Sequence, residues 1–305
     1  MAAPAATQVP APRSDAADLT AVLVCSVIWG TTWYAITLQL GTVPAVASIV
    51  YRFGLASLLL FGWCLVRRES LRLTPGQHLA VFGQGLFTFA IDYAFVYFSE
   101  ERIASAVVAV IFAGLAFLNL VAFRLVLGQK AARLAWIGAF AGLTGVGVMS
   151  YAEIARAGMD PRAAAGLAMA VVAVVAAVVG NLFAWRGQKL GVPVGPATAW
   201  AMFYGTALLA VYGFATGLEW SFEWTASYVL SLLHLSVFGS VTAFLLYFLL
   251  ARRRGYGFAA YISALTPPVA MVMSVAFEGA RFGLAAFGGL ALVLLGQWLL
   301  IRAKN

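Results

Sequence analysis

Long apolar runs, separated by short polar breaks, occupy almost the whole chain after about residue 18. The hydrocarbon core of a bilayer is about 30 Å thick, so an α-helix needs about 20 apolar residues to cross it. The pattern therefore predicts an all-α integral membrane protein with ten transmembrane helices. The expected spans are residues 19–40, 44–66, 77–98, 103–123, 133–151, 163–185, 194–216, 226–251, 256–277 and 283–301.

The segments outside these runs are too short for a further domain. Residues 1–18 are polar and rich in Ala and Pro, which predicts a disordered cytoplasmic tail. The first apolar run is longer than the core of a signal peptide and is expected to remain as a helix. Breaks such as Arg67-Arg68-Glu69 and Arg252-Arg253-Arg254 contain only a few residues, so almost all of the protein should lie in the bilayer.

Composition and charge placement agree with this picture and set the orientation. The chain is 63% hydrophobic and 10% charged, whereas soluble domains carry about 25% charged residues. With the N-terminus in the cytoplasm, fourteen Lys and Arg residues face the cytoplasm: Arg13, Arg67, Arg68, Arg72, Arg124, Lys130, Arg133, Arg186, Lys189, Arg252, Arg253, Arg254, Arg302 and Lys304. The other side holds Arg102, Arg156, Arg162 and Arg281. The positive-inside rule then places both termini in the cytoplasm. Because the net charge of +8 is explained by topology, no nucleic-acid partner is expected.

Several short motifs recur at an offset of about 150 residues. The matching pairs are Gly30 with Gly180, Gly41 with Gly191, and Tyr97-Phe98 with Tyr247-Phe248. The chain is therefore predicted to contain two five-helix repeats, 19–151 and 163–301. Since five is odd, the second repeat enters the membrane from the opposite side. Inverted repeats of this kind are typical of transporters, whose binding site lies near the middle of the membrane.

At this point the sequence resembles the EamA-type ten-helix members of the drug/metabolite transporter superfamily. The matching motifs are Trp29-Gly30, Arg52-Phe53-Gly54, Leu127-Gly128-Gln129-Lys130, Leu265-Thr266-Pro267-Pro268-Val269 and Phe277-Glu278-Gly279. Gln129 stands where the family usually has an acid, which argues against an essential acid there. Within the superfamily the chain looks most similar to the YddG-type exporters of aromatic amino acids. That resemblance implies export of amino acids, with aromatic ones favoured.

Polar side chains inside the spans are candidates for a substrate cavity, because an ionisable group costs about 2.5–3.5 kcal/mol to insert and usually faces the bundle interior. Gln84, Thr88 and Asp92 share one helix face, and an offset of 150 places His234 and Thr242 at matching positions. The alternative is that such groups only form hydrogen bonds between helices. The predicted cavity residues are Trp29, Trp33, Gln84, Thr88, Asp92, Asn181, Trp185, His234 and Thr242.

Three further features concern mechanism. Thr266, Pro267 and Pro268 predict a helix break that serves as a hinge or a cavity wall, with a simple packing kink as the alternative. Arg52 is expected to pair with backbone carbonyls or with Asp92, and the alternative is that it binds substrate. Asp92 is the one acid that the pattern places well inside a span, and transport is expected to be passive.

The predicted function is therefore export of amino acids across a bacterial inner membrane by alternating access. Exporters of other metabolites or drugs share this pattern, and a membrane-embedded lipid enzyme is the alternative of another class. Neither a cofactor motif nor a metal-ligand cluster occurs in the sequence, so no enzyme activity and no cofactor are expected. The expected partners are a small-molecule substrate and the lipid bilayer, with the protein a monomer or weak homodimer.

Overall fold

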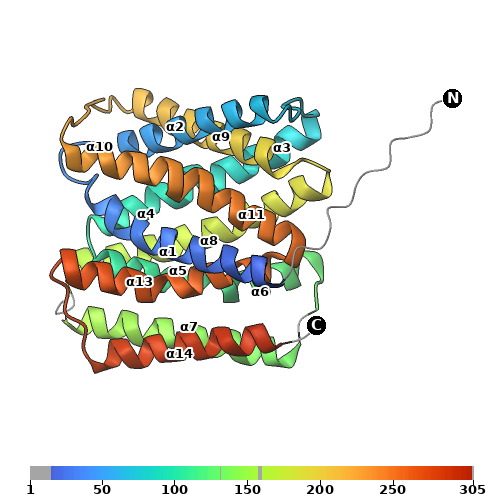
Figure 1. The fold of residues 1–305 in the computed structure, drawn as a ribbon. Helices are drawn as coiled ribbons and strands as arrows, with labels where there is room; N and C mark the ends of the chain where they lie inside the picture. The colour runs from blue at the N-terminus through green and yellow to red at the C-terminus, as the bar shows by residue number, and fades with distance from the viewer. Residues whose placement is uncertain (1–14, 131, 157–159, 304–305) are drawn as a thin grey trace.

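The computed structural model describes residues 15–130, 132–156 and 160–303, and within these ranges every regular element is helical (Figure 1). The α-helices of the first half are α1 (Asp15–Thr37), α2 (Ala45–Val66), α3 (Pro75–Gln84), α4 (Tyr93–Glu100), α5 (Ser105–Ala113), α6 (Leu115–Leu127) and α7 (Arg133–Arg156). Those of the second half are α8 (Pro161–Lys189), α9 (Val194–Ala215), α10 (Ala226–Leu233), α11 (Ala243–Arg254), α12 (Tyr256–Ala259), α13 (Tyr261–Phe277) and α14 (Leu284–Arg302). Two π-helical segments, η1 (Gly85–Asp92) and η2 (His234–Thr242), join α3 to α4 and α10 to α11.

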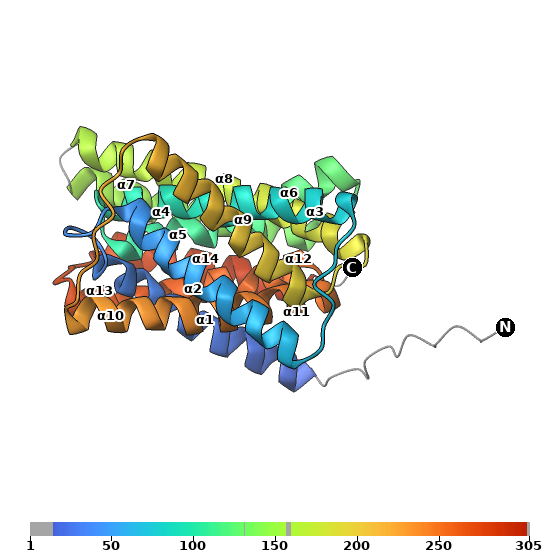
Figure 2. The ribbon, with the colours of Figure 1, turned by 90° about the horizontal axis from the view of Figure 1, so that it is seen from above.

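Among the described residues, eight helices are long and apolar enough to cross a membrane, and two shorter apolar stretches, Arg133–Met149 and Leu284–Leu299, lie in α7 and α14. The helices run between two ends of one bundle, which the view from above also shows (Figure 2). Their bounds agree with the predicted spans to within a few residues. The predicted disordered tail overlaps α1, which begins at Asp15; the rest of that tail lies outside the described residues.

The two ends of the bundle differ in which connections they contain. α1 begins and α14 ends at one end, which we call the terminal end (Figure 1). At the terminal end Asp18 forms ion pairs with Arg253 at 2.8 Å and Arg254 at 3.4 Å. α4 ends and α8 begins at the opposite end, the far end, where Arg162 Nη2 donates to the Glu101 carbonyl at 2.9 Å. The second half of the chain therefore starts from the far end and runs opposite to the first.

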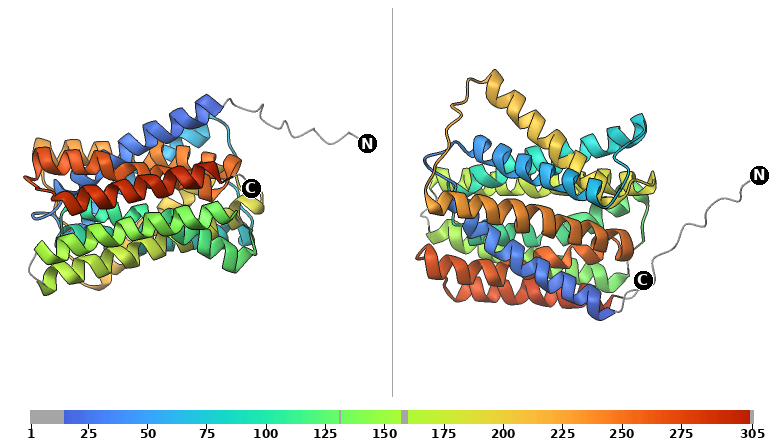
Figure 3. Two further views of the ribbon diagram at one scale, coloured as in Figure 1. Left: turned by 90° about the horizontal axis from the view of Figure 1, so that it is seen from below. Right: turned by 45° about the horizontal axis from the view of Figure 1, so that its top comes forward.

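The two π-helical segments are the most distinctive sign of an internal repeat. Their first residues are 149 positions apart and their last residues 150 positions apart. Helices at matching positions of the two halves also pack on each other, α2 on α9 and α7 on α14. Contact between equivalent helices is what a twofold axis between the halves produces. Two further views show α7 and α14 side by side along one face of the bundle (Figure 3).

Small residues allow α7 and α14 to approach closely. A Cβ added at Gly296 would lie 2.4 Å from the Gly138 carbonyl oxygen, and one added at Gly289 would lie 2.7 Å from that of Gly145. Backbone contact of this kind replaces the hydrophobic driving force, which is weak between helices in lipid.

The predicted helix break at Thr266, Pro267 and Pro268 is absent, because α13 continues through both prolines. Pro267 has no N–H, so the Ser263 carbonyl loses its usual helical donor. The Thr266 hydroxyl donates to that carbonyl at 2.8 Å and replaces the lost hydrogen bond. The regular helix is instead interrupted at Ala260, between α12 and α13.

Candidate functional site

A cavity lies in the middle of the bundle, between helices of both halves. It has about 70 Å³ of space for the centres of water-sized molecules, enough for several waters. Its aromatic wall consists of Trp29, Trp33, Tyr93, Phe112, Phe244 and Tyr247, and its polar wall of Thr32, Thr88, Asp92, Asn181, Ser263 and Thr266. The remaining lining residues are aliphatic.

The aromatic wall is held together by ring contacts and by one π-helical segment. The Trp29 ring centroid lies 5.2 Å from that of Phe244 and 5.4 Å from that of Tyr247. Trp29 Nε1 donates to the Gly239 carbonyl in η2 at 3.1 Å, which fixes the indole across the cavity. Trp33 packs on Phe112 with centroids 5.0 Å apart. The wall therefore presents several ring surfaces to one small space.

The polar wall centres on η1. Asp92 is buried, with 4% of its surface exposed, and its Oδ1 has no hydrogen-bond partner among the described residues. The same holds for the hydroxyl of Thr88, one turn earlier. Gly180 in α8 lies against this segment, since a Cβ there would lie 2.0 Å from Thr88 Oγ1. Two oxygen acceptors therefore line the cavity without a protein donor among those residues, as expected of a site for a cationic group.

A second polar group joins three helices beside the cavity. Asn181 Nδ2 donates to the Tyr247 hydroxyl at 2.9 Å and to Asn119 Oδ1 at 3.2 Å. Asn119 was missed by the sequence analysis, although an amide within the apolar run 103–123 is itself a signal of a buried polar contact. Its Nδ2 has no partner among the described residues. The group therefore adds polar side chains from α8 and α11 to the lining of the cavity.

Arg52 connects η2 with the first residue of α4, directly after η1. Its Nε donates to Ser240 Oγ in η2 at 3.0 Å, and its guanidinium lies over the Tyr93 ring, 4.6 Å from the centroid. These contacts differ from the prediction of backbone carbonyls or Asp92 as hydrogen-bond partners. Asp92 nevertheless lies within electrostatic reach of the guanidinium. Arg52 is fully buried, so it places a positive charge beside the cavity without lining it.

Five of the nine predicted cavity residues line this cavity: Trp29, Trp33, Thr88, Asp92 and Asn181. Thr266, predicted as part of a hinge, lines it too, while Pro267 and Pro268 do not.

The other four predicted cavity residues lie elsewhere. Gln84 lies one turn before Thr88 and is buried, but it does not line this cavity. A His234 ring nitrogen lies 3.1 Å from Thr31 Oγ1, and Thr242 Oγ1 donates to the Val237 carbonyl at 3.0 Å. Trp185 lines a separate recess near the terminal end, with Lys189 Nζ 5.6 Å from its ring centroid.

One buried acid was assigned by the sequence analysis to a loop. Glu100 is the last residue of α4, and only 7% of its surface is exposed. Neither carboxylate oxygen has a hydrogen-bond partner among the described residues. Glu100 is therefore a buried acid at the very end of its span, whereas Asp92 lies well inside the same span.

A helical membrane bundle with an internal repeat and a small, partly polar cavity in its middle has the architecture of a solute transporter. Comparison with known proteins gives the family: the chain belongs to the EamA-like transporter family, which matches residues 17–151 and again 164–302. It is a multi-pass inner-membrane protein of the transporter class. This confirms the resemblance at the level of the family and the drug/metabolite transporter superfamily.

Individual relatives support the same class. The chain is 25% identical over 290 residues to the uncharacterized inner membrane transporter YedA of Escherichia coli K12, a match that covers 92% of this chain and 91% of YedA. It is 33% identical over 129 residues to the protein PagO of Salmonella typhimurium, covering 41% of this chain and 42% of PagO. A solved crystal structure with 19% identity superposes with a TM-score of 0.73, over 96% of this chain and 100% of the other. That last likeness concerns the fold alone.

Proposed function

We propose that the protein exports amino acids, aromatic ones favoured, across the inner membrane by alternating access of its two halves. The observation that supports this most is the cavity itself, which several aromatic rings line together with a buried carboxylate, Asp92. Membership of a transporter family supports transport of a small molecule. The amino-acid substrate is our inference from the chemistry of the cavity and from the resemblance to aromatic amino acid exporters.

An amino acid is complementary to this cavity. Its ammonium group can donate to Asp92 Oδ1 and Thr88 Oγ1, which lack a donor among the described residues. Its carboxylate needs donors, and the indole N–H of Trp33 is a buried donor without a described partner. A side chain of almost any shape can rest on the rings of Trp29 and Phe244, which favours aromatic substrates without excluding others.

The proposal also includes the orientation of the protein in the membrane, the movement of its two halves and the driving force for export. We propose ten membrane spans, with α7 and α14 crossing although their apolar stretches are short, and with the terminal end in the cytoplasm. The basic residues at the ends of α2, α8 and α11 support that orientation. The two repeats, residues 19–151 and 163–301, then rock about the cavity and expose it to each side in turn. A high cytoplasmic amino-acid concentration would drive export without an ion gradient.

The test is counterflow in proteoliposomes that contain the purified protein. Liposomes are loaded with unlabelled phenylalanine, and uptake of labelled phenylalanine, leucine, glutamate, choline or glucose is followed. We expect the fastest exchange for phenylalanine, slower exchange for leucine, and exchange at the protein-free rate for glucose. The same assay is run with liposomes loaded with each unlabelled solute in turn. Faster exchange of glucose or choline than of any amino acid would favour an exporter of other metabolites. Covalent change of the liposome lipids without exchange would favour the enzyme alternative.

A further inference from the structure

A second pocket opens at the far end of the bundle, about 550 Å³ in volume for the centres of water-sized molecules. It lies where α1 and α4 end and where the chain passes from α13 to α14. Its polar residues are Thr37, Glu100, Ser105, Glu278 and Arg281. Ile103, Ala104, Ala280 and Phe282 form its apolar part. This pocket shares no lining residue with the central cavity.

The inner end of this pocket contains buried acceptors without a described donor. Both carboxylate oxygens of Glu100 and the hydroxyl oxygen of Ser105 are buried and unpartnered among the described residues. Glu100 is 7% exposed and Ser105 is 1% exposed, so water at the surface does not solvate them freely. A buried carboxylate is costly unless a cationic group or several donors satisfy it.

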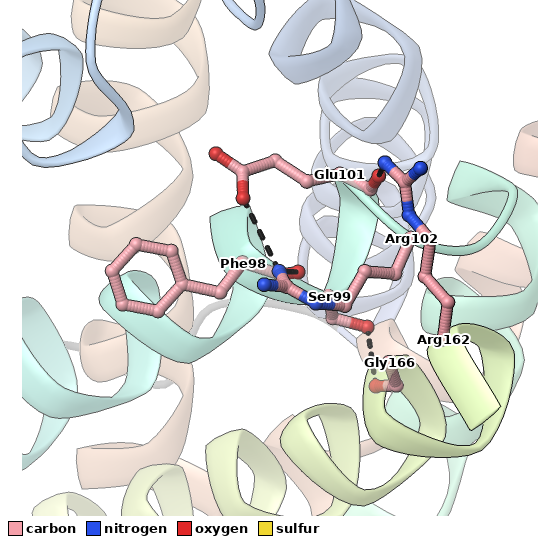
Figure 4. Close-up of polar contacts among 6 residues, drawn as sticks. All are labelled: Phe98, Ser99, Glu101, Arg102, Arg162 and Gly166. Carbon is pink, nitrogen blue, oxygen red and sulfur yellow. Dashed lines mark hydrogen bonds and ion pairs between the residues drawn. The ribbon is translucent and has the colours of Figure 1, made fainter.

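Hydrogen bonds hold the backbone on both sides of Glu100. Ser99 Oγ donates to the Gly166 carbonyl at 2.8 Å, and Arg162 Nη2 donates to the Glu101 carbonyl at 2.9 Å (Figure 4). The Arg102 side chain turns back to the Phe98 carbonyl (Figure 4). These contacts fasten the end of α4 to the start of α8 on both sides of Glu100.

Charges of both signs surround the buried carboxylate of Glu100. Glu278 lies within electrostatic reach of Glu100 and accepts a hydrogen bond from Ser274. The buried Arg52 also acts on Glu100 from the protein interior. Arg281 is exposed and supplies the guanidinium of the pocket. A ligand with an ammonium group near Glu100 and a carboxylate near Arg281 would satisfy both ends.

We propose that this far-end pocket is a second binding site for amino-acid substrates, distinct from the central cavity. The substrate's ammonium group binds Glu100 and Ser105, its carboxylate binds Arg281, and its side chain rests on Ile103 and Phe282. The substrate binds in this pocket during its passage between the central cavity and the far side of the membrane. This inference rests on the proposed function, because it takes the same substrate class.

The test measures how many phenylalanine molecules bind per chain, by equilibrium binding of labelled phenylalanine to the purified protein in nanodiscs. We expect two sites in the wild type. Glu100→Gln should weaken one of them about tenfold or more, since a hydrogen bond to a charged group is lost, and leave the other unchanged. Arg281→Gln, at an exposed position, should weaken the same site. Glu101→Gln is the matched control and should retain both sites.

Competitors identify the group that Glu100 binds. Phenethylamine, which has the ammonium group without the carboxylate, should compete at the Glu100 site, and 3-phenylpropionate should compete far less. A single site in the wild type that neither Glu100→Gln nor Arg281→Gln changes would overturn the second site while the proposed function stands. Displacement of phenylalanine from the Glu100 site by sodium at constant ionic strength, but not by phenethylamine, would overturn the second amino-acid site in favour of an inorganic cation site. Absence of any phenylalanine binding would overturn the site and the proposed function together.

Discussion

Replacing Asp92 by asparagine should weaken amino-acid binding about tenfold while leaving transport intact. Asn has nearly the same shape as Asp, so the substitution removes the charge of this buried side chain and little else. A hydrogen bond to a charged group is worth about 1.5–3 kcal/mol. Since 1.4 kcal/mol corresponds to a factor of ten, the expected loss of affinity is about 10- to 150-fold. Arg52, within electrostatic reach of Asp92, already balances part of its charge, which favours the lower end.

The assay is the concentration of phenylalanine that gives half-maximal counterflow. Glu219→Gln is the matched control, because Glu219 is an exposed acid in the segment between α9 and α10. It should leave the half-saturating concentration unchanged. Equal values for the wild type and Asp92→Asn would show that the substrate's ammonium group does not depend on Asp92, and the assignment of the cavity would fail.

The same variant tests energy coupling. For a passive exporter, Asp92→Asn should retain counterflow, and wild-type transport should cause no pH change in the liposome lumen. Because Glu100 is a second buried carboxylate, Glu100→Gln is tested in parallel. If a pH gradient alone concentrates substrate, and either variant abolishes only that uphill component, passive transport is refuted and proton antiport replaces it.

Three other substitutions examine the cavity, the helix packing and the topology. Trp33→Leu should raise the half-saturating phenylalanine concentration about 2- to 12-fold, because an aromatic pair contributes about 0.5–1.5 kcal/mol. The control Trp185→Leu, outside the cavity, should change that concentration less than twofold, and similar effects of the two substitutions would contradict the cavity assignment. Gly296→Ala should lower the free energy of unfolding of the purified protein by about 1–3 kcal/mol, because the added Cβ would lie 2.4 Å from the Gly138 carbonyl oxygen. Gly288→Ala, where a Cβ meets no neighbouring atom, should leave that free energy unchanged, and equal stability of the two variants would argue against close α7–α14 contact. With Cys25 and Cys64 replaced by Ala, Glu219→Cys should react with an impermeant maleimide on intact cells and Arg72→Cys should not, and the reverse pattern would invert the topology.

Local sequence determined the helical spans and the repeat. Each residue contributes its own transfer free energy to lipid, so a run of about 20 apolar residues predicts a span whatever it packs against. The bounds of α2 and α9 were predicted almost to the residue for this reason. The offset of about 150 residues was also visible in the sequence, and η1 and η2 repeat at that offset. Basic residues at the ends of spans are equally local, which is why they predict an orientation.

Tertiary structure decided which polar groups meet. Trp29 and Asn181 line one cavity because α1 and α8 both face it, whereas Gln84, one turn before Thr88, is buried without lining it. Glu100 looked like a loop residue because charges follow it directly, and only the contact of α4 with α8 buries its backbone neighbours. Pro267 and Pro268 remain within a helix, and the Thr266 hydroxyl replaces the N–H donor that Pro267 lacks. The spacing of apolar residues along the sequence does not reveal that hydrogen bond. Burial of a side chain depends on which helices pack around it, and that is a property of the whole bundle rather than of any one run.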